Sequence, residues 1–144
     1  MAPGAKDKTP GPARPNGEGG ETARVDPAVL LHITTPAGWA ASRTSGAIAP
    51  PSLAEVGFVH LSTPEQVALP ANRLFRGRSD LLLLVLDPAR IGVEVRWEPG
   101  VPGDPGAMRF PHAYGPVPTA AVVDVLPYRP RPDGGFAPPR LPRA

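Results

Sequence analysis

The chain has 144 residues, which is enough for one small domain, and its formal net charge at pH 7 is +2. It contains no cysteine, which excludes disulfides, thiolate metal ligands and cysteine nucleophiles. The positive charge is concentrated at the two ends of the chain, so that residues 25–129 are slightly acidic. Because these residues have no basic stripe, we do not expect nucleic acid as a partner.

The ends of the chain also differ from the centre in composition. Residues 1–24 are rich in Gly, Pro, Lys and Glu and lack aromatic residues, and residues 130–144 have Phe136 as their only large aromatic side chain. Such segments bury too little apolar surface to offset the entropy of ordering. We therefore expect a single domain at residues 25–129 between two disordered tails.

The sequence has no feature of a membrane protein. Its first residues lack the apolar centre of a signal peptide, and its longest apolar run, residues 81–86, is far too short to span a bilayer. We expect a soluble, cytoplasmic protein without a membrane partner.

The first predicted element is a strand at residues 29–34, which contains His32 among apolar strand formers. Thr35 and Pro36 follow it. Because threonine can cap a helix and proline suits the first helical turn, a short helix is expected around Trp39.

A second strand is expected at residues 57–62. In an extended chain, Phe58, His60 and Ser62 lie on one face, and apolar side chains occupy the other. The polar face must therefore line a pocket or meet solvent. The next four residues, 63–66, form a capping-box pattern and predict a helix over residues 64–75, which Pro70 should kink or end.

The remaining predicted elements are strands. Residues 81–86 are apolar on both faces and predict a central buried strand, whereas residues 93–97 alternate between apolar and charged side chains and predict a half-buried one. A Gly/Pro loop over residues 98–107 and a final strand over residues 120–126 follow. We predict an α+β fold with a compact, mixed β-sheet and two short helices.

All three histidines, His32, His60 and His112, lie outside the tails, and histidine readily exchanges protons or binds ligands near neutral pH. Their spacings do not match a local metal motif, and a zinc site without cysteine would need carboxylates such as Glu98. We therefore expect no metal site, and we interpret the histidines as part of a polar pocket. The alternative is that they are core residues bonded to backbone carbonyls, with Glu98 a solvated strand end and Tyr114 paired with His112 to hold a turn.

The segments that contain these residues resemble a known family in both composition and order. They are His32-Ile33-Thr34, Gly57-Phe58-Val59-His60-Leu61-Ser62-Thr63-Pro64-Glu65-Gln66-Val67, Arg96-Trp97-Glu98 and Phe110-Pro111-His112-Ala113-Tyr114-Gly115-Pro116. Together they resemble the domain of unknown function 952 family of small bacterial proteins, over nearly all of residues 30–126.

The resemblance implies a compact ADP-ribosyltransferase-like fold, a split β-sheet that holds NAD in its cleft. By resemblance, His32 would hold the adenosine-side ribose, the strand with His60 and Ser62 would pack beside the nicotinamide, and Glu98 would polarise the nicotinamide ribose. The chain departs from the transferase pattern because no tyrosine or Ser-Thr-Ser string occupies the second strand.

We predict three catalytic residues, His32, His60 and Glu98. A glutamate that accepts a hydrogen bond from a ribose hydroxyl would stabilise an oxocarbenium-like transition state. The residues predicted to bind the ligand, with NAD as the implied one, are His32, Thr34, Ser62, His112 and Tyr114.

Two classes of function stay open. The chain is either a transferase that uses NAD or a nucleotide, or a non-catalytic module that binds a nucleotide or another small ligand. If Glu98 faces the same concave space as the imidazoles of His32 and His60, the enzyme is favoured. If Glu98 points to bulk solvent, the binding module is favoured.

Overall fold

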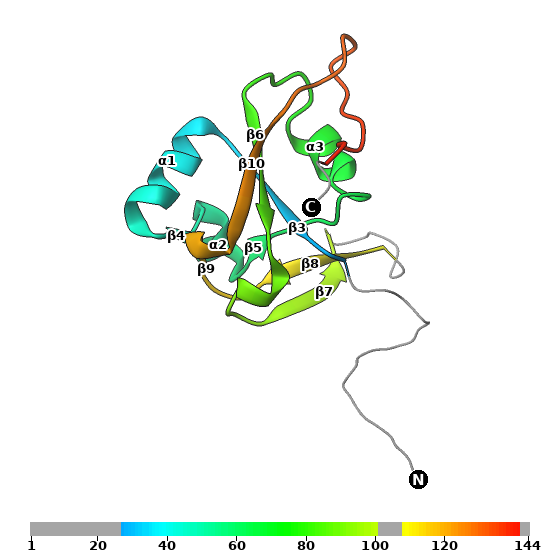
Figure 1. Cartoon of the computed structure of the whole chain (residues 1–144). Helices are drawn as coiled ribbons and strands as arrows, with labels where there is room; N and C mark the ends of the chain where they lie inside the picture. The colour runs from blue at the N-terminus through cyan, green and yellow to red at the C-terminus, as the bar shows by residue number, and fades with distance from the viewer. Residues whose placement is uncertain (1–26, 101–107, 142–144) are drawn as a thin grey trace.

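Two three-stranded antiparallel sheets, a two-stranded ribbon and three short α-helices make up the described part of the chain (Figure 1). The computed structural model describes residues 27–100 and 108–141. The expected tail at residues 1–24 lies outside these ranges. Among the described residues, no helix has the length and apolar composition needed to cross a membrane.

The first sheet has β6 (Leu81–Leu86) at its centre, antiparallel to β3 (Leu30–Thr34) on one side and β10 (Val122–Tyr128) on the other. Leu83 and Leu84, which point to opposite faces of the sheet, are both fully buried. The prediction of a central buried strand is therefore confirmed.

The second sheet consists of β5 (Val59–His60), β8 (Arg109–Ala113) and β7 (Val95–Pro99), with β8 in the middle. The two sheets are joined where Leu31 and Ser62 exchange backbone hydrogen bonds of 2.8 and 2.9 Å.

Strand β8 was not predicted, because Pro111 lacks the N–H that a central strand normally uses. The structure accommodates this proline with its carbonyl, which accepts a 3.0 Å hydrogen bond from the backbone N–H of Leu61.

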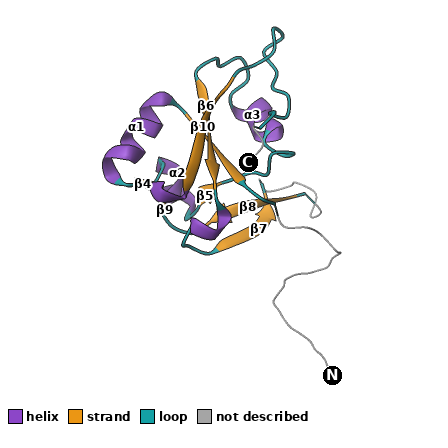
Figure 2. Ribbon diagram, viewed as in Figure 1, coloured by secondary structure: helices purple, strands orange, loops and turns teal. Residues whose placement is uncertain are grey.

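The smaller elements connect the two sheets and flank them (Figure 2). Helix α1 begins as predicted: Pro36 occupies its first turn, and the Thr35 hydroxyl accepts a 3.1 Å hydrogen bond from the Gly38 N–H. Helix α2 was not predicted, because Pro50 and Pro51 at its start indicate a break in regular structure. The remaining elements and their bounds are α1 (Pro36–Ser45), β4 (Ala47–Ile48), α2 (Pro51–Val56), α3 (Ala68–Leu74), η1 (Pro88–Arg90), β9 (Val117–Pro118) and η2 (Thr119–Ala121).

The predicted capping box is present, but the α-helix begins later than expected. The backbone N–H of Gln66 donates to the Thr63 hydroxyl at 3.2 Å, and the backbone N–H of Thr63 donates to Gln66 Oε1 at 3.1 Å. Residues 64–67 form turns, and α3 starts only at Ala68. Pro70 therefore lies in the first turn of α3, where a missing N–H costs no helical bond, and it neither kinks nor ends the helix.

Apolar side chains form a core on each face of the first sheet. One core includes Leu84 and Leu86 and is packed between this sheet, the second sheet, Trp39 of α1 and Leu53 of α2. The other includes Leu83 and is covered by α3 and the C-terminal segment. The described residues thus form an α+β domain, in agreement with the predicted fold class.

Residues 130–141 pack against the domain, whereas the sequence predicted a disordered tail at residues 130–144. Phe136 is only 2% exposed and belongs to the second core. Asn72 of α3 holds its backbone on both sides, since Asn72 Oδ1 accepts from the Phe136 N–H at 2.6 Å and Asn72 Nδ2 donates to the Phe136 carbonyl at 3.0 Å. The Tyr128 hydroxyl donates to the Ala137 carbonyl at 2.6 Å. One buried aromatic side chain with satisfied backbone groups orders a segment whose average composition indicates disorder.

Candidate functional site

Polar and aromatic side chains gather on one face of the β5-β8-β7 sheet. The opposite face carries Val59 and Ala113 into the core. Because His60 pairs with His112 and Arg96 also pairs with His112, these three side chains share the face that points away from that core. We call the group the histidine–glutamate cluster; its members are Phe58, His60, Arg96, Glu98, His112 and Tyr114.

The Glu98 carboxylate is held at one oxygen by two donors. Its Oε1 lies 2.9 Å from His112 Nδ1 and accepts a 2.7 Å hydrogen bond from the Tyr114 hydroxyl. These bonds, first that of Tyr114 and then that of His112, lower the pKa of Glu98 below its ordinary value. Glu98 is therefore a carboxylate near neutral pH, and its side chain is 33% exposed. The described residues provide no partner for Oε2.

His112 is the buried centre of the cluster. It is 2% exposed, and its ring stacks on that of Phe58 with centroids 4.0 Å apart and planes 13° apart. Since the Glu98 carboxylate can only accept, His112 Nδ1 carries the proton of this contact. Nε2 is buried and has no hydrogen-bond partner in the described part of the chain. A buried polar atom without a partner costs stability, so it is the kind of group that calls for a functional explanation.

Aromatic contacts complete the cluster around Phe58. Its ring lies 4.9 Å from that of His60 and 5.3 Å from that of Tyr114, and the His60 and His112 rings meet edge to face at 5.4 Å. The Arg96 guanidinium lies 4.1 Å above the Tyr114 ring. The hydrogen bond to Glu98 raises the pKa of Tyr114, so its hydroxyl remains a donor.

His32 lies at the junction of the two sheets rather than against Glu98. It is 7% exposed, and its Nδ1–H donates a 2.9 Å hydrogen bond to the His60 carbonyl. Burial, and to a lesser degree the nearby His60 ring, lowers the pKa of His32, so the ring is neutral at pH 7. Burial also lowers the pKa of His60, with a further contribution from His112.

The predicted site residues therefore fall into two linked groups. Glu98, His112 and Tyr114 are hydrogen-bonded to one another, and His60 contacts this group through its ring. Among the described residues, the His32 ring bonds to the backbone carbonyl of His60, and Glu98 makes no hydrogen bond to the side chain of His32 or His60.

Two other predicted ligand-binding residues lie near the junction. Ser62 is buried beside Leu31, with which it exchanges backbone bonds, and Thr34 is half-buried at the end of β3. In the described ranges, no group of three or more histidine or acidic side chains is placed to hold a metal ion.

Phe58 and Arg96 belong to the cluster but were not predicted as site residues. The alternation along residues 57–62 does place Phe58 on the face of His60. The alternation along β7 likewise places Arg96 on the face of Glu98, but its contact with the Tyr114 ring depends on the pairing of β7 with β8, which the sequence did not show.

Comparison with known proteins finds a matching family and similar solved structures. The sequence profile of the family described as "Protein of unknown function (DUF952)" matches residues 33–125. The crystal structure of protein CC0527 from Caulobacter crescentus is 29% identical, with a TM-score of 0.65 over 76% of this chain and 93% of that one. The solution NMR structure of CC0527, also 29% identical, gives a TM-score of 0.62 over 75% and 90% of the two chains. No curated protein matches this chain.

Proposed function

This chain belongs to the DUF952 family, and we propose that it is a transferase that uses NAD or a related nucleotide at the histidine–glutamate cluster. The observation that carries the proposal is the state of Glu98. Its carboxylate is ionised, fixed at Oε1 by Tyr114 and His112, and one-third exposed. A fixed carboxylate whose second oxygen has no partner among the described residues is the arrangement needed to stabilise positive charge on a reacting sugar.

In this proposal, Glu98 Oε2 accepts a hydrogen bond from a hydroxyl of the ribose that carries the leaving base. As the bond between the ribose carbon and the base breaks, the base leaves with the bonding electron pair, and the carboxylate stabilises the positive charge that develops on the ribose. The oxygen of water or of an acceptor hydroxyl then forms the new bond to the ribose carbon and gives up its proton. His112 and Tyr114 act as positioning residues, because their two donors keep the carboxylate from turning away. The proton on His112 Nδ1 stays on the side of Glu98.

The arrangement of the two sheets supports the same proposal. A split sheet with a histidine on its first strand is what the resemblance to ADP-ribosyltransferases implies, and here His32 of β3 lies at the junction with β5. His60, whose pKa is lowered, is an exposed neutral imidazole beside the cluster and can exchange hydrogen bonds with a bound ribose or phosphate.

A second candidate is a module that binds the same ligand without chemistry. The position of His32 favours it, because the ring already uses Nδ1 to bond the His60 carbonyl and is nearly inaccessible. The hydrogen bond from His32 to the His60 carbonyl holds the two sheets together whether or not catalysis occurs.

The test is release of nicotinamide from NAD by the full chain and its Glu98→Gln variant. We expect wild-type turnover to be lost in Glu98→Gln, while melting temperature and affinity for ADP-ribose stay close to wild type, because the amide keeps the shape but not the charge. The matched control is Glu94→Gln, since Glu94 is exposed and pairs with Arg96 outside the carboxylate's hydrogen bonds.

Each outcome separates the candidates. Binding of ADP-ribose without any turnover in the wild type would favour the binding module. If neither NAD nor ADP-ribose changes the melting temperature of the wild type, both candidates are wrong for these ligands.

A further inference from the structure

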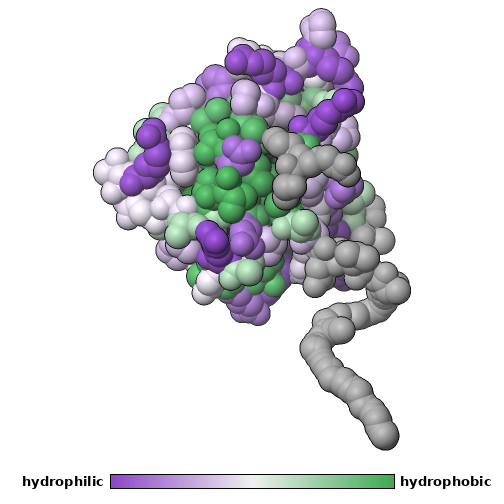
Figure 3. All heavy atoms as spheres, viewed as in Figure 1, coloured by the Kyte–Doolittle hydropathy of each residue, from purple (hydrophilic) through white to green (hydrophobic). Residues whose placement is uncertain are grey.

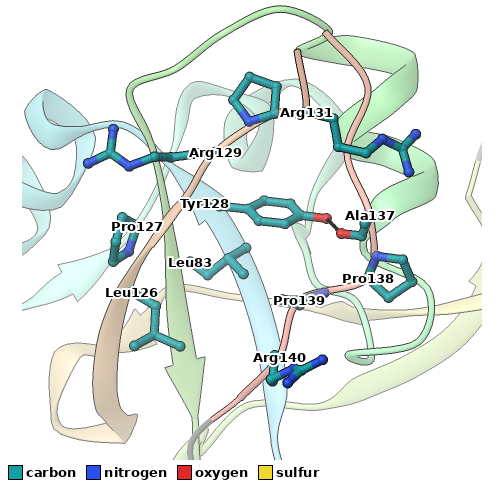
Figure 4. Close-up of a pocket in the computed structure, with 11 residues that line it drawn as sticks. Leu83, Leu126, Pro127, Tyr128, Arg129, Arg131, Ala137, Pro138, Pro139 and Arg140 are labelled. Carbon is teal, nitrogen blue, oxygen red and sulfur yellow. Dashed lines mark hydrogen bonds between the residues drawn. The ribbon is translucent and has the colours of Figure 1, made fainter. Parts of the chain in front are cut away.

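A cavity lies on the other side of the first sheet, away from the histidine–glutamate cluster. It has a volume of about 370 Å³, and its walls come from β6, β10 and the C-terminal segment (Figure 4). This volume is in the range of small-molecule sites. None of the residues that line it belongs to the cluster.

The walls of the cavity are held in place by bonds that the fold already makes. The Tyr128 hydroxyl donates to the Ala137 carbonyl, which ties the end of β10 to the C-terminal segment across the cavity (Figure 4). Phe136, next in the chain to Ala137, is buried and bonded to Asn72. The prolines of both walls have little conformational freedom, so the cavity is formed before any ligand binds.

The lining combines an apolar floor with a cationic rim. Leu126 and the prolines of both walls form the accessible floor, above the buried Leu83 and Tyr128, and Figure 3 shows an apolar area over β6 and β10 on this face of the molecule. Burial raises the pKa of Tyr128 to about 12, so its hydroxyl adds no negative charge.

The rim carries three arginines and no acidic side chain. Figure 4 shows Arg129 on one side of Tyr128 and Arg131 and Arg140 on the other. Arg131 lies 3.7 Å from the Asp133 carboxylate, whereas Arg129 and Arg140 have no ion-pair partner among the described residues. The rim therefore has positive charge that the described part of the chain does not neutralise.

We propose that this cavity, between β10 and the C-terminal segment, is a second binding site, for a small molecule that joins an anionic group to an apolar body. The apolar body lies against Leu126 and the neighbouring prolines, because Leu83 beneath them is fully buried. The anionic group, a phosphate or a carboxylate, lies at the mouth, where the exposed side chains of Arg129 and Arg140 can turn toward it. The site is separate from the proposed catalytic cluster and does not depend on its function.

The test uses phenyl phosphate as the anionic probe and phenol as its neutral counterpart, titrated by calorimetry into the full chain. We expect saturable binding of phenyl phosphate that weakens as salt is added, and weaker binding of phenol. The double variant Arg129→Gln/Arg140→Gln should bind phenyl phosphate about tenfold less tightly, because each lost charge-assisted bond removes affinity. The matched control is Arg43→Gln/Arg90→Gln, which loses the same charge at exposed positions outside the cavity.

Amide NMR shifts of the wild type provide a readout that does not depend on the variants. We expect the shifts caused by phenyl phosphate to fall on residues 126–131 and 137–140. The proposal is overturned if no saturable binding occurs, if phenol binds equally well, or if the control double variant loses as much affinity as the cavity double variant.

Discussion

His32 makes the stability of the domain depend on pH. Burial lowers the pKa of its ring in the folded chain, whereas in the unfolded chain it binds a proton with a pKa of about 6.5. The neutral ring therefore contributes stability that is complete above this pKa and decreases as the pH falls below it. His60 makes stability depend on pH in the same direction, because its pKa is also lowered.

We expect the free energy of unfolding in urea to decrease when the pH is lowered from about 7.5 to about 5.5. His32→Gln, which keeps a donor for the His60 carbonyl, should flatten this dependence, and His60→Gln, at a more exposed position, should flatten it less. A wild-type stability that is constant over this range would contradict the assignment of a neutral, buried His32.

The Tyr114 hydroxyl is the largest cause of the lowered pKa of Glu98. Tyr114→Phe removes this donor and keeps the ring under Arg96. We expect the pKa of the Glu98 carboxyl, followed by carbon-13 NMR, to rise toward its ordinary value in this variant. An unchanged Glu98 titration would show that the hydrogen bond seen in the structure does not hold the carboxylate.

Four members of the histidine–glutamate cluster, among them His60, were named from the sequence, but their hydrogen-bond partners were not. His112, Tyr114 and Glu98 stand out by type and by their unusual sequence context. Their hydrogen bonds depend on β8 lying between β5 and β7, and the Gly/Pro-rich stretch that separates β7 from β8 carries no periodic signal that sets this register. The link of His32 to the His60 carbonyl joins residues 28 positions apart and could not be predicted for the same reason.

At the level of elements, β6 is the strand on which both cores depend. Leu83 and Leu84 are fully buried on opposite faces, whereas Leu82 is half-buried. Leu83→Ala and Leu84→Ala should each cost about 2 to 5 kcal/mol of unfolding free energy, and Leu82→Ala should cost less. Urea denaturation measures all three. If Leu83→Ala or Leu84→Ala loses no more unfolding free energy than Leu82→Ala, one face of β6 is not packed as described.

The elements that sequence reasoning located share strong local signals. The apolar run of β6 and the Thr35–Pro36 start of α1 each follow from residues that are neighbours in the chain. The elements that sequence reasoning missed have weak local signals. Strand β8 contains Pro111 and depends on strands on both sides, and two prolines stand at the start of α2. Local propensity is a weak guide in such segments.

At the scale of the whole molecule, the domain extends to the C-terminal segment. Phe136 fills the second core and is bonded to Asn72, so this segment covers a face of the first sheet that would otherwise meet solvent. Phe136→Ala should cost about 3 to 5 kcal/mol, whereas Leu141→Ala, at a half-buried position near the end of the segment, should cost less. Thermal and urea unfolding of both variants check this expectation. A Phe136→Ala variant as stable as the wild type would restore the expectation of a dispensable tail from Pro130 onward.

The central claim is that the histidine–glutamate cluster binds a nucleotide with an accessible ribose, and the most direct measurement is a map of amide NMR shifts on addition of ADP-ribose. We predict saturable shifts that concentrate at Glu98, His112 and Tyr114, with the same pattern and similar affinity in Glu98→Gln. Shifts confined to the arginine-rimmed cavity around Tyr128, or no saturable shifts at all, would contradict the claim.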